Sequence, residues 1–301
     1  MIIVRFQGGL GNQISQYAFC RLLQKRYPGI TIKADLDFYL HNSNHQGYEL
    51  ERVFEGIILE KVSAKEFLRV TGKISEAFLC QRGYEKKLIK IINHFLPLKK
   101  ANWLYQSITT KYPEEDIYRN LNVKRDWYLD GYWHNYNYNE IMDQLREELK
   151  FVRLSDSQNR ECEKRIIEDE NSISVHVRKG DYVGSMYDIL GVDYYKEAIK
   201  VIKNCRTSPK FYLFSDNIEM AKKIWTEINC ENKVEYIVWN KGVNSYYDMY
   251  LMSLCRDNII ANSTFSYWAA QLNKNRKKIV IRPKMQTAER ETWDVENWIK
   301  I

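Results

Sequence analysis

The C-terminal half of the chain alternates short apolar runs with helical stretches, and this alternation constrains the fold more than any other feature. Five runs are predicted to be strands, at residues 172–177, 210–214, 234–238, 258–261 and 278–282. None of them alternates apolar and polar residues, which is typical of strands buried on both faces. Because a helical stretch precedes each run, this half is predicted to be a doubly wound α/β domain with a parallel sheet.

The N-terminal half opens with the same kind of unit. An apolar strand at 2–6 leads through a glycine turn to a helix at 13–27 and a second strand at 30–34, which is a βαβ arrangement. A chain of 301 residues suits two domains. We predict domains at 1–150 and 151–301, with a helical insertion over about 60–127 that holds helices at 62–79 and 84–96. An aromatic strand is expected at 127–133.

Composition narrows the class of protein. Hydrophobic residues make up 45% of the chain, which is ordinary for a globular protein and excludes disordered and fibrous classes. The net charge of +7 comes from charges of both signs mixed along the chain, so no nucleic-acid partner is expected, whereas an anionic substrate suits it. The six cysteines lie in no metal-ligand spacing. With no signal peptide or apolar run of membrane-spanning length, a cytoplasmic location is expected.

Residues 84–100 form a basic amphipathic segment with two alternative interpretations. Leu88, Ile91, Ile92 and Phe95 share one face of the expected helix, and lysines lie elsewhere. Such a helix could lie on the inner membrane surface, which would make the protein peripherally associated. The more common arrangement for such a helix is that its apolar face packs on its own domain, and this interpretation is favoured here.

Polar clusters follow several predicted strands, where ligands of doubly wound sheets bind. In the cluster after the strand at 172–177, His176 and Arg178 share one face. Arg178 offers a planar fork for two phosphate oxygens, and Lys179 adds a second charge. Such a cluster can neutralise a departing diphosphate without a metal. The alternative is that Arg178 pairs with Asp181 and only holds the loop.

The other clusters are ambiguous on their own. Gly9 and Gly11 with Asp35 match part of a dinucleotide-binding fingerprint, but Ile14 stands at its third glycine. Residues 215–217 could bind a ribose or cap a helix, and residues 262–266 could hold a phosphate or cap one. Asp35 and Asp37 have the spacing of a metal–diphosphate site, but two acids at this spacing are a common coincidence. No metal site is predicted.

Together these motifs resemble the α-1,2-fucosyltransferases of glycosyltransferase family 11, bacterial type. The resemblance rests on segments in the family's order, which read GGLGNQ at 8–13 followed by QYA at 16–18, HVRKGDY at 176–182, FSD at 214–216 and NSTFSYWAA at 262–270. Lys179 stands where the family usually carries a second arginine. Asp35 with Phe38 and Tyr39, residues 47–50 and residues 131–133 also look like landmarks of the family.

The resemblance implies a fold, a reaction and a set of site residues. The fold is α/β and GT-B-like, with two Rossmann-like domains facing across a cleft. Fucose passes with inversion from GDP-fucose, bound by the C-terminal domain, to a galactoside 2-hydroxyl on an oligosaccharide or glycolipid acceptor, in surface polysaccharide or O-antigen synthesis. No metal or cofactor is implied. The expected residues are catalytic Arg178, His176 and Asp181, donor-binding Gly11, Asn12, Gln13, Lys179, Asp216, Asn262, Ser263 and Thr264, and acceptor-side Asp35, Tyr132 and Trp133.

Two other functions stay open at this point. Gly9, Gly11 and Asp35 would suit a nicotinamide-dependent oxidoreductase, and the aromatic content of 14% would suit a sugar-binding module without catalysis. The sequence leaves the acceptor glycan and the general base undetermined. Asp181 is our candidate for the base.

Overall fold

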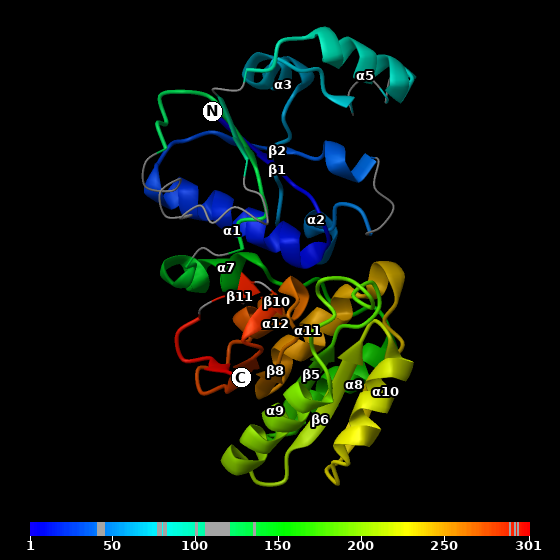
Figure 1. Cartoon of the computed structure of the whole chain (residues 1–301). Helices are drawn as coiled ribbons and strands as arrows, with labels where there is room; N and C mark the ends of the chain where they lie inside the picture. The colour runs from blue at the N-terminus through cyan, green and yellow to red at the C-terminus, as the bar shows by residue number, and fades with distance from the viewer. Residues whose placement is uncertain are drawn as a thin grey trace. The chain divides into compact units, whose positions relative to one another are not determined.

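The computed structural model describes residues 1–40, 46–76, 80, 83–99, 102–105, 121–134, 137–288, 290–291, 293 and 295–301. These residues form two compact units, Met1–Lys150 and Phe151–Ile301. Each unit has its own parallel sheet with helices on both faces (Figure 1). The chain is therefore α/β in both halves.

The first unit is built on a four-stranded parallel sheet in the order β2-β1-β4-β3. Its strands are β1 (Ile2–Arg5), β2 (Ile32–Asp35), β3 (Trp103–Tyr105) and β4 (Trp127–Asp130). Helix α1 (Leu10–Arg26) lies on one side of the sheet, and α3 (Ala64–Thr71) and α5 (Lys86–Phe95) lie on the other (Figure 1). The shorter elements are η1 (Asp37–Leu40), α2 (Leu50–Val53), η3 (Asn139–Ile141) and α7 (Met142–Glu148).

Helix α3 is shorter than the helix predicted at 62–79. It begins with a capping box between Ser63 and Glu66. It ends at Gly72, whose φ of +75° is left-handed. A Cβ atom at Gly72 would lie 2.1 Å from the carbonyl oxygen of Pro97, so the helix stops where only glycine fits. Residues 77–79 of the predicted helix lie outside the described residues.

The second unit confirms the predicted doubly wound sheet. Six parallel strands run in the order β12-β9-β8-β5-β6-β7. All five predicted strands are present, and β12 adds an edge. The strands are β5 (Ser172–Val177), β6 (Lys210–Ser215), β7 (Val234–Ile237), β8 (Asp257–Ile259), β9 (Val280–Arg282) and β12 (Ile299–Lys300). A separate antiparallel pair is formed by β10 (Met285–Thr287) and β11 (Arg290–Glu291).

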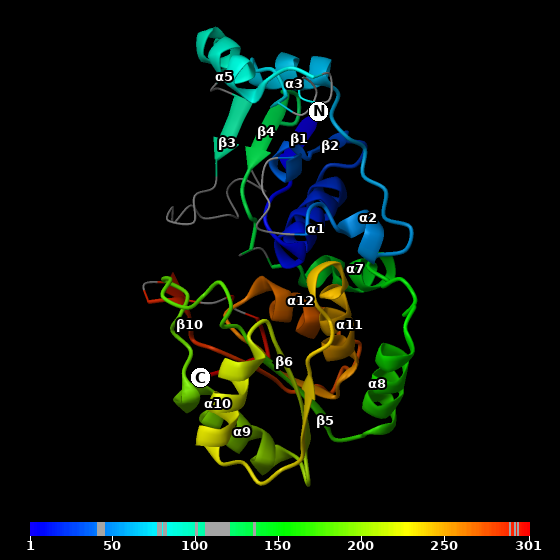
Figure 2. The same ribbon diagram turned by 90° about the vertical axis from the view of Figure 1, so that its right-hand side faces the viewer.

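Helices cover both faces of this sheet. On one face, α9 (Val192–Cys205) and α10 (Ile218–Ile228) pack on the buried residues Ile173, Val175 and Val177 of β5. On the other face lie α8 (Ser157–Glu168), α11 (Tyr246–Leu254) and α12 (Thr264–Leu272), with η4 (Gly242–Asn244) before α11. Figure 2 shows α8 and α11 across β5 and β6 from α9 and α10.

The strand order places a topological switch point at β5. From β5 the chain moves outward to β6 and β7, and it then returns to the opposite side of β5 for β8 and β9. The loops that follow β5 and β8 therefore leave the sheet in different directions. In parallel α/β sheets, this is where ligands bind.

Helix α5 does not pack through its apolar stripe on the described residues. Ile89 is buried, whereas Leu88, Ile91 and Phe95 are 46%, 56% and 80% exposed. The interpretation that this stripe packs on its own domain is wrong for these side chains. In the described part of the chain, no helix combines the length and apolarity that a membrane span requires.

Candidate functional site

Arg178 is the first residue after β5, and two carboxylates hold it. Its Nη2 lies 2.7 Å from Oδ1 of Asp181, and its Nη1 lies 3.0 Å from Oδ2 of Asp216. The guanidinium carbon lies over the ring of Tyr182, 5.3 Å from its centre. Its Nε is buried and has no hydrogen-bond partner among the described residues. The structure therefore fixes a cation in place at the switch point and leaves one of its N–H groups uncommitted.

Asp216 organises this loop from the end of the neighbouring strand β6. Its Oδ1 accepts a hydrogen bond of 2.8 Å from the backbone N–H of Lys179, while its Oδ2 pairs with Arg178. A Cβ atom at Gly180 would lie 2.5 Å from Oδ2, so the loop closes over Asp216 only with glycine there. The carboxylate predicted to contact the ribose or guanine thus positions Arg178 in this structure.

His176 is a neutral group in this site. Its side chain is 4% exposed, and burial lowers its pKa to about 4, with Asp216 opposing and Arg178 reinforcing the shift. At neutral pH it adds no positive charge beside Arg178. Its Nδ1 has no hydrogen-bond partner among the described residues. The structure thus places a buried imidazole nitrogen without a hydrogen-bond partner close to Arg178 in the chain.

Lys179 points into its own loop. Its side chain is buried, and its Nζ lies 2.5 Å from Oδ1 of Asp188. Asp188 also accepts a hydrogen bond from the N–H of Gly184, and the pairing with Lys179 holds the pKa of its carboxyl below the usual range. In this structure the charge of Lys179 is paired within the 179–188 loop, and its contact with the donor stays a prediction.

The loop after β8 is tied down in a similar way. Asn262 is 1% exposed and donates hydrogen bonds to the carbonyl oxygens of Tyr187 and Gln286. Ser263 is the N-cap of α12, and its Oγ accepts a hydrogen bond of 3.3 Å from Phe265 N. Both predicted donor-binding side chains thus have structural partners. Thr264 is the first residue of α12, whose N-terminus suits an anion and lies beside His176 through a ring contact with Phe265.

The glycine motif of the first unit forms the turn between β1 and α1. Gly8 has a φ of +79°, and a Cβ there would lie 2.3 Å from Nδ2 of Asn12. Gly11 lies in the first turn of α1, where its carbonyl accepts a hydrogen bond from Ser15. Asn12 is half-buried, with its Oδ1 3.1 Å from Nε2 of His134.

Gln13 has a structural role that the sequence did not reveal. Its side chain is fully buried, and its Nε2 donates to the carbonyl oxygens of Gly8 and Gly47. Its Oε1 accepts a hydrogen bond of 2.8 Å from the N–H of Glu49. The predicted contact between Gln13 and the donor is corrected, because the carboxamide holds the turn at Gly8.

The three acceptor-side residues differ in access. Trp133 is fully buried and stacks on Phe19 with ring centres 4.3 Å apart, so it has no face for a sugar and that prediction is corrected. Tyr132 is half-buried, with its ring 5.3 Å from that of His134. Asp35 is 1% exposed, yet it lines a cavity, and its Oδ2 accepts a hydrogen bond of 2.6 Å from Tyr128.

Comparison with known proteins assigns the family. The family described as Glycosyl transferase family 11 matches residues 1–301. The chain belongs to this family. It is 30% identical to the O-antigen biosynthesis glycosyltransferase WbnK of Escherichia coli, over 98% of each chain. It is 28% identical to an alpha-1,2-colitosyltransferase of Escherichia coli, over 100% of this chain and 99% of that one. The fucosyltransferase NodZ from Bradyrhizobium, a solved structure, has 16% identity, a TM-score of 0.48 and coverage of 89% and 91%.

Membership of family 11 confirms the predicted resemblance, and the protein is a glycosyltransferase. The oxidoreductase alternative, which rested on Gly9, Gly11 and Asp35, is set aside. Both carboxylate oxygens of Asp35 accept hydrogen bonds within the protein, from Tyr128 and from the N–H of Asp37. Burial and the charge of Asp37 raise the pKa of Asp35 to about 7.

The described residues contain no group of three His, Cys, Asp or Glu side chains suited to a metal ion.

Sequence reasoning missed several residues of the candidate site. Asp188 and Phe265 escaped notice because their roles depend on loop and helix packing rather than on spacing. Tyr182 lies in the recognised motif, but its aromatic face under Arg178 was not assigned. The signal that could have indicated this contact is the position of Tyr182, an aromatic residue four positions after Arg178 in the same loop.

Proposed function

We propose that this glycosyltransferase transfers fucose from GDP-fucose to the 2-hydroxyl of a galactoside, with inversion at the fucose carbon. The observation that carries the proposal is Arg178, a guanidinium positioned at the switch point with one unused N–H, in a chain that matches family 11 throughout. A relative named for colitosyl transfer makes a nucleotide-linked colitose the second candidate donor.

In the proposed reaction, the acceptor oxygen forms a bond to the sugar carbon as the bond from that carbon to the diphosphate oxygen breaks. The electron pair leaves with GDP, and Arg178 stabilises the negative charge that develops there. The N-terminus of α12 and Nδ1 of His176 offer further polar groups to the diphosphate.

Asp181 has a place in this proposal as the base. It is 60% exposed, so it is the partner of Arg178 that a diphosphate displaces more easily than Asp216, which the loop holds. Once displaced, its carboxylate is free to accept the proton of the acceptor hydroxyl.

The reaction is tested with purified protein, GDP-fucose or a colitose nucleotide, and a panel of β-galactosides. Mass spectrometry detects the glycosylated product, and free GDP is measured in parallel. NMR of the product then gives the linkage. A product linked at another hydroxyl, or transfer from a different sugar nucleotide alone, contradicts the proposal. Release of GDP without product supports the donor and contradicts the acceptors of the panel.

Sugar transfer is expected to continue in EDTA at the rate seen without it. The reason is that a fixed guanidinium and the N–H groups of a helix N-terminus can neutralise the leaving diphosphate. The initial rate is measured before and after exhaustive chelation. A loss of activity that added Mg²⁺ or Mn²⁺ restores would contradict this expectation and reopen the pair Asp35 and Asp37.

We also propose that the product enters a surface polysaccharide, in line with the relative named for O-antigen biosynthesis.

A peripheral contact with the membrane that carries such glycans would use the exposed stripe of α5. The protein is expected to float with vesicles of anionic lipid, and Ile91→Asp with Phe95→Asp is expected to lower this binding about tenfold or more, because two exposed apolar side chains become charged. Ile58→Asp, at an apolar residue 86% exposed outside α5, is the control. Equal flotation of all three proteins would refute the contact.

A further inference from the structure

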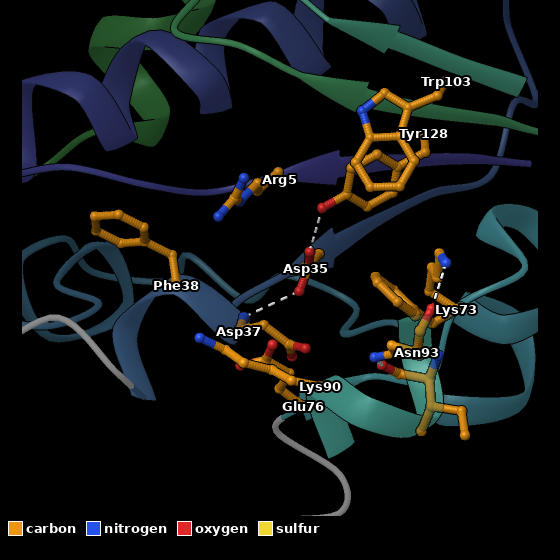
Figure 3. Close-up of a pocket in the computed structure, with 12 residues that line it drawn as sticks. Arg5, Asp35, Asp37, Phe38, Lys73, Glu76, Lys90, Asn93, Trp103 and Tyr128 are labelled. Atoms are coloured by element: carbon orange, nitrogen blue, oxygen red, sulfur yellow. Dashed lines mark hydrogen bonds between the residues drawn. The ribbon is translucent and has the colours of Figure 1, made fainter. Parts of the chain in front are cut away.

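A cavity of about 440 Å³ opens on the face of the first unit's sheet that carries α3 and α5. Figure 3 shows Arg5, Asp35 and Tyr128 from the sheet on one side of it, and Lys90 and Asn93 of α5 on the other. Its volume lies within the roughly 300–1,000 Å³ of typical small-ligand pockets. The described residues that line it all belong to the first unit, whereas Arg178 belongs to the second.

Acidic and basic side chains are mixed in the lining of this cavity. Three carboxylates and three cations face it, namely Asp35, Asp37, Glu76, Arg5, Lys73 and Lys90. The carboxylates would repel an anionic ligand, and the ammonium and guanidinium groups would repel a cationic one. A neutral ligand with many hydroxyl groups satisfies both kinds of lining, because each hydroxyl donates one hydrogen bond and accepts others.

Most of these polar groups are held rigidly by the protein. Arg5 pairs with Asp130 at 2.9 Å, and Nζ of Lys73 donates to the carbonyl oxygens of Asn93 and Leu96. The two bonds of Lys73 link the end of α5 to the segment after α3 and keep these cavity walls together. Lys90 differs, because it makes no hydrogen bond or ion pair with the described residues. Its exposed ammonium group is available to a ligand.

Aromatic rings complete the lining. Trp103 is half-buried against Tyr128, with ring centres 4.2 Å apart, and Phe38 lines the cavity near the guanidinium of Arg5. The apolar C–H face of a pyranose packs on such rings while its hydroxyl groups reach polar neighbours. Aromatic walls with carboxylates, an amide and an ammonium group therefore suit a sugar ring.

The cavity adjoins the glycine turn of the first unit. Phe38 is followed by Tyr39, whose hydroxyl donates a hydrogen bond of 3.1 Å to the carbonyl oxygen of Gly8. We propose that the cavity binds a neutral sugar residue of the acceptor glycan, with Phe38 and Trp103 contacting its ring and Lys90 bonding a hydroxyl group. This inference rests on the proposed function, since it identifies the acceptor that the reaction uses. It makes the segment that carries α3, α5 and β3 the determinant of acceptor choice.

Binding is tested first without any reaction, by isothermal titration of the full-length protein with lactose and with lactobionate. Both ligands contain galactose, but lactose has a neutral glucose ring where lactobionate has an open-chain gluconate that carries a carboxylate. Lactose is expected to bind about tenfold more tightly or better, because the mixed lining favours a neutral ring with hydroxyl groups. Lys90→Ala and Trp103→Ala are each expected to weaken lactose binding by about fivefold to tenfold. Lys87→Ala is the matched control, because Lys87 is an exposed lysine of the same helix outside the cavity. Lactose binding by either cavity variant within twofold of wild type overturns the proposal, as does tighter binding of lactobionate.

Kinetics separate this proposal from the proposed function. In the transfer assay, the two cavity variants are expected to raise KM for the acceptor while GDP affinity and acceptor-independent release of GDP stay at wild-type values. A change in GDP affinity instead would overturn the assignment to the acceptor. If wild-type protein binds lactose through Lys90 and Trp103 but transfers no sugar to any acceptor, the proposed function fails while the cavity's sugar site stands.

Discussion

Replacing Arg178 with alanine is expected to lower kcat for sugar transfer by about 10²–10³, which is the usual loss when one group that stabilises developing charge is removed. The guanidinium is held between Asp181 and Asp216 at the switch point. The other cation of this loop, Lys179, points into the loop and pairs with Asp188, so the variant loses the cation that faces outward. The same change leaves both carboxylates facing the diphosphate without a counter-charge. The measurement is the initial rate at saturating donor and acceptor.

Two further variants make this result interpretable. Arg178→Lys keeps the charge and loses the planar fork, so its rate should fall between those of wild type and Arg178→Ala. Arg276→Ala removes an exposed arginine of the same unit and should keep the wild-type rate. If folded Arg178→Ala retains more than half of wild-type turnover, Arg178 does not stabilise the leaving group.

Replacing Arg206 with methionine is expected to lower the free energy of unfolding around β8 by about 3–5 kcal/mol, because it leaves a buried carboxylate unpaired. Asp257 is fully buried and accepts hydrogen bonds from Nε and Nη2 of Arg206, at 2.7 and 3.0 Å, and from the N–H of Ile279. The pair thus joins the end of α9 to the centre of the second unit's sheet. Native-state hydrogen exchange of the β8 and β9 amides measures the effect.

The same experiment has an internal rescue. Adding Asp257→Asn to the Arg206→Met variant removes the unpaired charge and should recover a large part of the lost free energy. Lys203→Met, at an exposed lysine of α9, should leave exchange unchanged. A double variant as unstable as Arg206→Met alone would show that lost packing, rather than an uncompensated charge, causes the destabilisation.

The second unit could be predicted closely because its strands are continuous apolar runs. The bounds predicted for β5 agree with the structure, and β6 is one residue longer than predicted. A strand that is buried on both faces has consecutive apolar residues, and such a run is visible in the sequence. β3 was missed because three half-exposed or exposed residues, Trp103–Tyr105, make no such run and depend on pairing with β4 for their strand geometry.

The sequence predicted which residues lie at the strand ends of the candidate site, but it predicted few of their hydrogen-bond and packing partners. The motif placed His176, Arg178 and Asp216 at adjoining strand ends, as the structure has them. The Arg178–Asp181 pair was foreseen as an alternative, since the two residues are close in sequence. Burial of Gln13 and Trp133 was not, because it depends on Gly47, Glu49 and Phe19, which the fold brings to them from distant segments.

If Arg178 binds the diphosphate as proposed, its two carboxylate partners make that binding an ion exchange. Before any substrate binds, the guanidinium already carries its own resident counter-ions, so an incoming anion gains only the difference between its bonds and theirs. A singly charged buffer anion gains little by such a swap, whereas a diphosphate brings more charge and several acceptor oxygens. The resting protein thus filters its ligands by valence. In the proposed reaction, Asp181 would pair with Arg178 again once the nucleotide has left.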